Sequence, residues 1–474
     1  MSETIQTAHN FRLITRFGIL LLTALLIGLL TSCQETNQAP HNDPDNSELV
    51  AASIEEGQIK STPQSPVESE IVTPEIEWVE EITPQPSPAV DYFDSLYPAS
   101  QTDYVIPLTV RHAGSDRAEL FFELSEPSEG KLVYQSLLPG SSERGEIQLD
   151  PGEIRHMIEL EGLTPGNSYA AKLLLGNDEG GFSEPPFGTE TWGKVEFKTI
   201  AAGAPLRVGV LGDASFGDQA TQQLVELMVG YDLDFVIHTG DVVYEVDSSN
   251  LFESYLNKFF QPFKPLLLKG PVYTVLGNHD YDQTVMFQDA PFYDYAFPAF
   301  EDPAYEYPPE RRGNQFYGLA FGDLQFLMLD SQAIYGAGGR EVQDAWMKEQ
   351  LADTHFRHTI PVFHVSPYSS SVVHPGDGGP VRLSWNYLFE AANVPLVLSG
   401  HFHHYERLSS NGITYIVTGG GSSTLYAQGG SLAESHIYVP RTHFVLLEIY
   451  PDRIELSAIA KEGETFDRAT IMLE

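Results

Sequence analysis

The chain has 474 residues, of which 42% are hydrophobic, so it is long enough for two or three domains with a sizeable core. Its formal net charge of −40 at pH 7 argues against a nucleic-acid partner, whose phosphates require Lys and Arg. The same charge disfavours adhesion to anionic lipid. An acidic protein of this kind can still hold an anion locally if bound metal ions supply the positive charge.

The N-terminus has the features of a signal peptide over residues 1–32. Arg12 and Arg16 precede an apolar run that closes at Leu30-Thr31-Ser32-Cys33, which is too short for a comfortable membrane span. Cys33 is the single cysteine of the chain, so no intramolecular disulfide can form. The segment resembles a bacterial lipoprotein signal, with an ordinary signal peptide or a membrane anchor as alternatives. The resemblance implies export and a lipid anchor on Cys33 at the bacterial cell envelope or surface.

Residues 33–91 are rich in Pro, Glu, Ser, Thr and Gln, and Lys60 is their one basic residue. Low hydrophobicity combined with charge of one sign cannot bury enough apolar surface to fold. We therefore predict a disordered, Pro-stiffened tether in this range.

Residues 92–200 contain short alternating segments separated by turn residues, which predicts an all-β sandwich. The sequence Leu163-Thr164-Pro165-Gly166-Asn167-Ser168-Tyr169 resembles the turn and tyrosine that lead into a late strand of fibronectin type III domains. We interpret this region as a spacer or packing domain, with contact to a substrate or partner as the alternative. The strands are expected at 108–112, 118–124, 131–135, 156–160, 169–175 and 195–199.

Residues 201–474 alternate strand and helix patterns, which is typical of an α/β domain. An aromatic-rich and Pro-rich insertion at 281–312 interrupts the rhythm, and it could form either a lid or plain packing. The last segments are predicted to be antiparallel strands. Strands are expected at 206–211, 234–239, 272–276, 315–321, 324–329, 360–364, 396–399, 413–418, 442–449, 454–460 and 469–473, and helices at 218–228, 250–263, 342–351 and 382–392.

Polar residues follow five of these apolar strands, at the edge where open α/β sheets place their chemistry. Each residue alone has a structural alternative, such as a helix cap, a turn residue or a core histidine. Together they mix oxygen and imidazole donors, which suits two cations that share a carboxylate. The residues are Asp213, Asp241, Asn278, His364, His401 and His403.

The blocks that hold these residues resemble those of calcineurin-like metallophosphoesterases, and in particular purple acid phosphatases. The blocks are Gly212-Asp213, Gly240-Asp241-Val242-Val243-Tyr244, Gly277-Asn278-His279-Asp280, His364-Val365-Ser366-Pro367-Tyr368 and Gly400-His401-Phe402-His403. The resemblance implies a four-layer α/β/β/α metallophosphoesterase sandwich after the fibronectin III-like one. It also implies the hydrolysis of small-molecule phosphate esters, with phosphomonoesters expected first.

The resemblance further implies which residues bind each of two metal ions. The first metal would take Asp213, the bridging Asp241, Tyr244 and His403. The second would take Asp241, Asn278, His364 and His401. Many family members carry a histidine two residues after the first aspartate, where this chain has Ser215, and the phenolate of Tyr244 would fill that vacancy. Phenolate is a hard donor that suits Fe(III), and Zn, Mn or Fe(II) is expected at the second site.

In this family a hydroxide bridging the two metals attacks phosphorus in line. His279 resembles the histidine that stabilises the transition state or protonates the leaving oxygen, and His374 lies near the position of another substrate-side histidine. The alternatives are a phosphodiesterase or nucleotide-directed hydrolase at the same site, and a non-catalytic surface binding protein.

Overall fold

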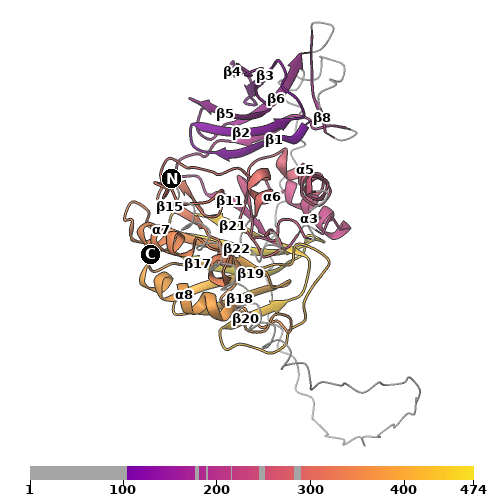
Figure 1. Ribbon diagram of the computed structural model, residues 1–474. Coiled ribbons are helices and arrows are strands. Elements are labelled where there is room, and N and C mark those ends of the chain that lie inside the picture. Colours follow the sequence, from indigo (N-terminus) through magenta and orange to yellow (C-terminus); the bar gives the residue numbers. More distant parts are fainter. Residues whose placement is uncertain are drawn as a thin grey trace, which may run out of the picture. The chain divides into compact units, whose positions relative to one another are not determined.

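A computed structural model describes residues 104–176, 181–187, 190–214, 216–244, 251–281 and 290–473 (Figure 1). The predicted signal peptide and its Cys33, the tether, and Ser215 lie outside these residues. The described residues all fall in one unit, Thr83–Glu474. Among them, no helix is both long enough and apolar enough to cross a membrane.

The first described segments are strands that form two larger antiparallel sheets and a two-stranded one, β8-β9. One sheet has the order β1-β2-β5, and the other has the order β10-β6-β3-β4 with β7 beside β6. The hydroxyl of Tyr169 accepts a hydrogen bond from the Thr164 amide at 2.7 Å, as the tyrosine of a fibronectin-type corner does. The fibronectin type III assignment stays a prediction. The strands are β1 (Tyr104–Ala113), β2 (Arg117–Leu124), β3 (Gly130–Ser136), β4 (Arg144–Gln148), β5 (Arg155–Glu161), β6 (Ser168–Gly176), β7 (Phe182–Ser183), β8 (Pro186–Phe187), β9 (Glu190–Thr191) and β10 (Val195–Lys198).

A six-stranded mixed sheet follows, in the order β13-β12-β11-β21-β22-β23. Strands β11, β12 and β13 run parallel to one another, whereas β21 to β23 pair antiparallel. The strands are β11 (Leu206–Leu211), β12 (Phe235–His238), β13 (Val272–Thr274), β21 (His443–Ile449), β22 (Arg453–Ala460) and β23 (Thr465–Met472).

A second, seven-stranded sheet has the order β14-β15-β16-β17-β19-β18-β20. Its centre, from β15 to β19, is parallel, and antiparallel strands complete both edges. Strands β18 and β20 were not among the predicted elements. The strands are β14 (Tyr317–Phe321), β15 (Leu324–Met328), β16 (His358–Val365), β17 (Leu396–Gly400), β18 (Tyr405–Ser410), β19 (Ile413–Thr418) and β20 (Ser435–Val439).

The two sheets share one apolar core, and helices cover their outer faces. Ile237 of β12 and Ile360 of β16 belong to the same buried cluster, which lies between the sheets. The next residue towards the N-terminus of β12, Val236, packs instead with helices α3 (Gln219–Val229) and α5 (Gln261–Leu267). On the second sheet, Phe363 packs with α7 (Arg340–Ala352) and α8 (Gly378–Ala391). Successive residues of a strand therefore pack into different layers. The mixed α/β fold is as predicted.

Two helices depart from the predicted bounds by more than two residues. Helix α8 begins at Gly378 rather than at residue 382, because Pro380 lies in its first turn, where no intrahelical acceptor is lost. The single helix expected at 250–263 is three pieces, α4 (Leu251–Tyr255), a π-helical turn (Leu256–Phe260) and α5 with Pro265 inside it. Helix α3 has a side-chain cap at its N-terminus, since the Asp218 carboxylate accepts a hydrogen bond from the Thr221 amide at 2.9 Å.

The described part of the insertion, residues 290–312, packs against the N-terminal strands. Helix α6 (Pro291–Ala296) buries Tyr293, and Arg155 of β5 donates a hydrogen bond to the Tyr295 carbonyl at 2.8 Å. Arg111 of β1 donates to the Pro298 carbonyl. These contacts fit the packing alternative for the described part of the insertion.

Candidate metal centre

The ends of five strands bring the predicted ligands together. Asp213 follows β11, Asp241 follows β12, Asn278 follows β13, His364 is the last residue but one of β16, and His401 follows β17. Three of these residues have left-handed backbones, with φ of 55° at Asp213, 53° at Asp241 and 69° at His401. A left-handed conformation costs an L-residue roughly 1–2 kcal/mol, and such strain is concentrated at functional sites.

Asp213, Tyr244 and His403 form one half of the cluster. The Tyr244 hydroxyl donates a hydrogen bond to Asp213 Oδ1 at 2.9 Å and lies 2.9 Å from His403 Nε2. His403 Nε2 lies 3.4 Å from the same carboxylate oxygen. All three side chains are buried, so their donor atoms converge on one small volume inside the protein.

Asp241, Asn278, His364 and His401 form the other half. His364 Nε2 lies 3.3 Å from Asp241 Oδ1 and 3.2 Å from Asn278 Oδ1. His401 Nδ1 lies 3.1 Å from the same Asn278 oxygen. One carboxylate, one amide oxygen and two imidazoles therefore face one another, as the predicted second metal requires.

The two halves adjoin each other. Donor atoms of Asp213, Asp241 and His364 all lie within 4.8 Å of one another. The backbone amide of His401 also donates to Asp213 Oδ2 at 2.9 Å, which ties the second half to the first. The structure thus brings all seven predicted ligands into one cluster, while their metal-binding roles stay predictions.

Glycines before the ligands create the space for this convergence. A Cβ on Gly400 would lie 2.5 Å from Asp213 Oδ2, and one on Gly240 would lie 2.6 Å from His364 Nδ1. Heavy atoms this close would displace the ligand. Steric crowding therefore explains why a glycine precedes the aspartate or the histidine in these sequence blocks.

Backbone carbonyls fix the ring orientation of two histidines. His364 Nδ1 lies 2.9 Å from the Thr239 carbonyl, and His403 Nδ1 lies 3.0 Å from the Thr424 carbonyl. Because a carbonyl only accepts, each Nδ1 must carry the proton, and each Nε2 faces the cluster. Hydrogen bonds of this kind orient the histidine ligands of metals in proteins.

The electrostatics of the cluster favour cations. Burial alone would lower the pKa of His364, but the charges of Asp241 and Asp213 raise it to about 9. Burial would likewise raise the pKa of Asp241, and His364 brings it below its usual range. Burial followed by the charges of Asp213 and Asp241 raises the pKa of Tyr244 well above that of a free tyrosine. The described contacts of these two buried carboxylates include no Lys or Arg, which fits the chemistry of a dinuclear metal site.

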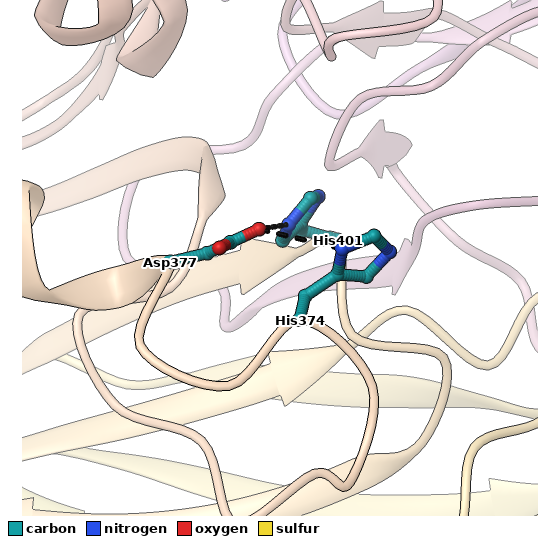
Figure 2. A group of neighbouring side chains, drawn as sticks. All are labelled: His374, Asp377 and His401. Atoms are coloured by element: carbon teal, nitrogen blue, oxygen red, sulfur yellow. Dashed lines mark hydrogen bonds and ion pairs between the residues drawn. The ribbon is translucent and has the colours of Figure 1, made fainter. Parts of the chain in front are cut away.

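His279 and His374, the two predicted catalytic residues, lie beside the cluster. The His279 amide donates to Asp241 Oδ1 at 2.9 Å, and the ring centroids of His279 and Tyr244 are 4.4 Å apart. The ring centroid of His374 lies 4.9 Å from that of His401 (Figure 2). His374 is exposed and His279 is half-buried, as Asn278 is, whereas the other predicted ligands are buried.

Asp377 was not among the predicted site residues. Its Oδ2 atom lies 3.1 Å from His401 Nε2 and 3.5 Å from His374 Nδ1. Figure 2 shows its carboxylate pointing at His401, with His374 alongside. A carboxylate directly before a helix and three residues after a histidine is a common surface pattern, so the sequence did not distinguish it.

Two aromatic residues and one buried acid were missed as well. Phe216 stacks on Tyr244 with 4.0 Å between centroids, and Tyr426 stacks on His403 with 4.2 Å. Asp280 is buried, and it accepts hydrogen bonds from the amides that follow Asp241 and from the amide before Asn278. The position of Asp280 next to the Asn278-His279 pair was the available signal.

His404 and Arg407, which follow His403 in the sequence, belong to two separate networks. His404 Nε2 lies 3.2 Å from Glu406, which also accepts from the Ser370 hydroxyl at 2.6 Å. Arg407 instead forms two hydrogen bonds to Asp467 of β23, at 2.7 and 3.1 Å. The first network holds the loop after β16, and the second joins the two sheets.

Comparison with known proteins agrees with this geometry. Residues 206–405 match the family described as calcineurin-like phosphoesterase. The chain is 26% identical over 221 residues to a probable purple acid phosphatase 20 of Arabidopsis thaliana, a match covering 45% of this chain and 49% of that protein. It is 25% identical over 306 residues to purple acid phosphatase 23 of the same plant, covering 58% and 62%. The chain thus spans about half to three-fifths of the length of these two relatives.

Another relative and two solved structures extend the comparison. A nucleotide pyrophosphatase/phosphodiesterase of Hordeum vulgare is 26% identical over 285 residues, covering 53% of this chain and 74% of that protein. A purple acid phosphatase from yellow lupin (Lupinus luteus) has the same fold, with a TM-score of 0.61 at 18% identity over 77% of this chain and 74% of that one. The structure of PhoD has a TM-score of 0.55 at 13% identity, covering 79% and 90%. Residues 206–405 are therefore similar to calcineurin-like phosphoesterases, and purple acid phosphatases are among the proteins that the chain resembles.

Proposed function

We propose that this protein is a purple acid phosphatase-like hydrolase that cleaves small phosphomonoesters with the help of two metal ions. The observation that carries the proposal is the convergence of seven oxygen and imidazole donors at five strand ends, with donor atoms of Asp213, Asp241 and His364 within 4.8 Å of one another. Fe(III) is proposed beside Tyr244, and Zn, Mn or Fe(II) at the second position. Asp241 lies between the two halves of the cluster and is proposed to be the shared ligand.

Two cations bound here would supply an acidified water as the nucleophile and would neutralise charge on the phosphoryl oxygens. The chain itself supplies the remaining functions. His279 and His374 border the cluster and can donate hydrogen bonds to a phosphoryl group, and either can protonate the leaving oxygen.

Replacement of Asp241 by Asn tests this proposal. Asp241→Asn keeps the size of the side chain but removes the charge of the shared ligand, so we expect the hydrolysis of p-nitrophenyl phosphate to be lost. Asp323→Asn is a matched control, because the Asp323 carboxylate is 53% exposed and lies beside Arg357 on the surface. Unchanged turnover in Asp241→Asn would sink the dinuclear proposal.

A phosphodiesterase directed at nucleotides is the second candidate, and the barley relative named above favours it. A planar leaving group would find aromatic surface at Tyr426 and Phe216, which are partly exposed beside the cluster. Parallel assays of p-nitrophenyl phosphate and bis(p-nitrophenyl) phosphate separate the two activities. A higher kcat/KM for the diester would replace the monoesterase proposal.

A non-catalytic surface binding protein is the alternative from another class. Complete retention of the predicted ligands and of His279 argues against a decayed site. Fewer than two metal equivalents in protein purified under metal-replete conditions, together with no hydrolysis, would favour this alternative.

We further propose export and lipid anchoring at Cys33, with residues 33–91 as a tether and residues 92–200 as a fibronectin III-like domain ahead of the domain at 201–474. The sequence Leu30-Thr31-Ser32-Cys33 after an apolar run supports the anchor. Expression in a bacterium fed radiolabelled palmitate should label the wild type and leave Cys33→Ser unlabelled. Equal labelling of both would contradict the anchor.

A further inference from the structure

The three predicted histidine ligands each have a hydrogen-bond partner behind the ring, but the partner of His401 is of a different kind. For His364 and His403 it is a backbone carbonyl, which no substitution removes. For His401 it is the side chain of Asp377, whose Oδ2 lies 3.1 Å from Nε2. The orientation of His401 is therefore the one among these three that depends on another side chain.

The ring of His401 is also turned the opposite way. His364 and His403 direct Nε2 into the cluster, whereas His401 directs Nδ1 towards Asn278 Oδ1 at 3.1 Å. A lone pair on Nδ1 requires the proton to be on Nε2, and a carboxylate on that side favours this tautomer. We propose that Asp377 is a positioning residue that holds His401 in the Nδ1-donor tautomer and thereby sets the affinity of the second metal. This inference rests on the proposed dinuclear centre.

The surrounding chain holds Asp377 for this contact. The Asp377 amide donates to the His374 carbonyl at 3.2 Å, which closes a turn that contains Gly376 with φ of 95°. The Asp377 carbonyl accepts a hydrogen bond from the Tyr335 hydroxyl. Although Asp377 precedes α8, its side chain makes no capping hydrogen bond to that helix. Its carboxylate is thus directed at the histidines rather than at the backbone of α8.

The same carboxylate oxygen lies 3.5 Å from His374 Nδ1. His374 is 45% exposed and has a left-handed backbone, with φ of 57°, so the turn presents it beside His401 (Figure 2). One carboxylate therefore contacts both a ligand of the second metal and a substrate-side histidine. Loss of Asp377 should weaken the second metal and release His374, while Asp213, Tyr244 and His403 keep their contacts.

Metal titration of the metal-free full chain tests the proposal without reference to activity. Zn²⁺ is titrated against a competing chelator into the wild type, Asp377→Ala, Asp377→Asn and the control Glu341→Ala, which removes an exposed acid from the first turn of α7. In Asp377→Ala we expect the dissociation constant of the weaker metal site to rise about 10- to 100-fold, because loss of a residue that orients a histidine ligand lowers metal affinity by this factor. Asp377→Asn keeps an acceptor oxygen and should fall between the wild type and Asp377→Ala. The dissociation constant of the tighter metal site should be the same in all four proteins.

Each other outcome overturns the inference in a recognisable way. If both Asp377 variants bind two equivalents as tightly as the wild type, Asp377 does not position His401, although the proposed function stands. If the wild type binds three equivalents and Asp377→Ala binds two, then Asp377 is itself a ligand with His374 and His401. If both constants rise together and the melting temperature of Asp377→Ala falls, its role is structural. A wild type that binds no pair of metals would instead refute the proposed function.

Discussion

Single glycines decide whether the two carboxylates of the cluster can approach the histidines. Gly400 ends β17 directly before His401, and the carboxylate of Asp213 occupies the space where a side chain on Gly400 would lie. The left-handed backbones of Asp213, Asp241 and His401 add a conformational cost at the same strand ends. The space around the predicted ligands is therefore filled, and an added side-chain atom would displace them.

We expect Gly400→Ala to lose metal and to destabilise the fold. The added Cβ would lie 2.5 Å from Asp213 Oδ2 and 2.8 Å from Thr239 Oγ1, and relief of such crowding costs about 1–3 kcal/mol. Gly379→Ala in α8 is the matched control, since its Cβ would meet no heavy atom within 4 Å. Urea unfolding and metal analysis of both variants provide the comparison. Equal stability and metal content for the two would show that the space beside Asp213 is not restrictive.

At the scale of elements, Asp280 ties the loop after β12 to the loop after β13. Its carboxylate accepts hydrogen bonds from the amides of Val242 at 2.9 Å, Val243 at 3.1 Å and Gly277 at 2.8 Å. These amides flank Asp241 and Asn278, so the two loops that supply ligands share one buried anchor.

Replacement of Asp280 by Ala should therefore loosen both loops. Three buried N–H groups would lose their acceptor, and we expect the free energy of unfolding to fall by about 3 kcal/mol or more. Asp280→Asn retains one acceptor oxygen and should lose less. Hydrogen exchange of the Val242, Val243 and Gly277 amides measures the loosening directly. Unchanged exchange in Asp280→Ala would contradict this role.

The elements were predictable where one residue pattern decides the structure. Parallel strands such as β11, β12 and β16 are buried apolar runs, and residues after them must meet at one edge of the sheets. This explains why Asp213, Asp241 and His364 could be grouped from the sequence. Strand β20 could not be predicted in this way, because Ser435–Val439 is a short segment without a buried residue that pairs with β18.

The start of α8 and the role of Asp377 were also missed because they depend on tertiary contacts. Gly378-Gly379-Pro380 reads as a helix break, yet α8 begins there because the first turn of a helix tolerates Pro. Asp377 contacts His401 across 24 residues of sequence, and only the turn after His374 brings them together. Local patterns predict the ligands, whereas the partners of those ligands depend on the folded loops.

At the scale of the whole molecule, one buried neutral histidine contacts the C-terminal domain from the N-terminal strands. His112 of β1 is 3% exposed, and its Nδ1 lies 2.8 Å from the hydroxyl of Tyr273 in β13. Burial, followed by the charges of Arg117 and Arg111, lowers the pKa of His112 from 6.5 to about 3. The folded protein therefore binds this proton more weakly than the unfolded chain does.

Stability should consequently fall on acidification below about pH 6.5. The contribution of His112 is fully present above the unfolded pKa and is lost as the pH falls towards 3, which amounts to about 2 kcal/mol between pH 7 and pH 5. His112→Gln should reduce the stability difference between these pH values by this amount in urea unfolding. His443, whose pKa burial lowers to about 4, keeps its own share in both proteins. An identical pH dependence of wild type and variant would show that His112 is not the group responsible.

Seven side chains from five strand ends are proposed to hold two metal ions that are required for phosphate ester hydrolysis. Metal is added stepwise to chelator-treated protein, and the turnover of p-nitrophenyl phosphate is measured at each step. The geometry of the cluster predicts no turnover without metal and a maximum at two equivalents per chain. Full turnover by the metal-free protein, or a maximum at one equivalent, would contradict it.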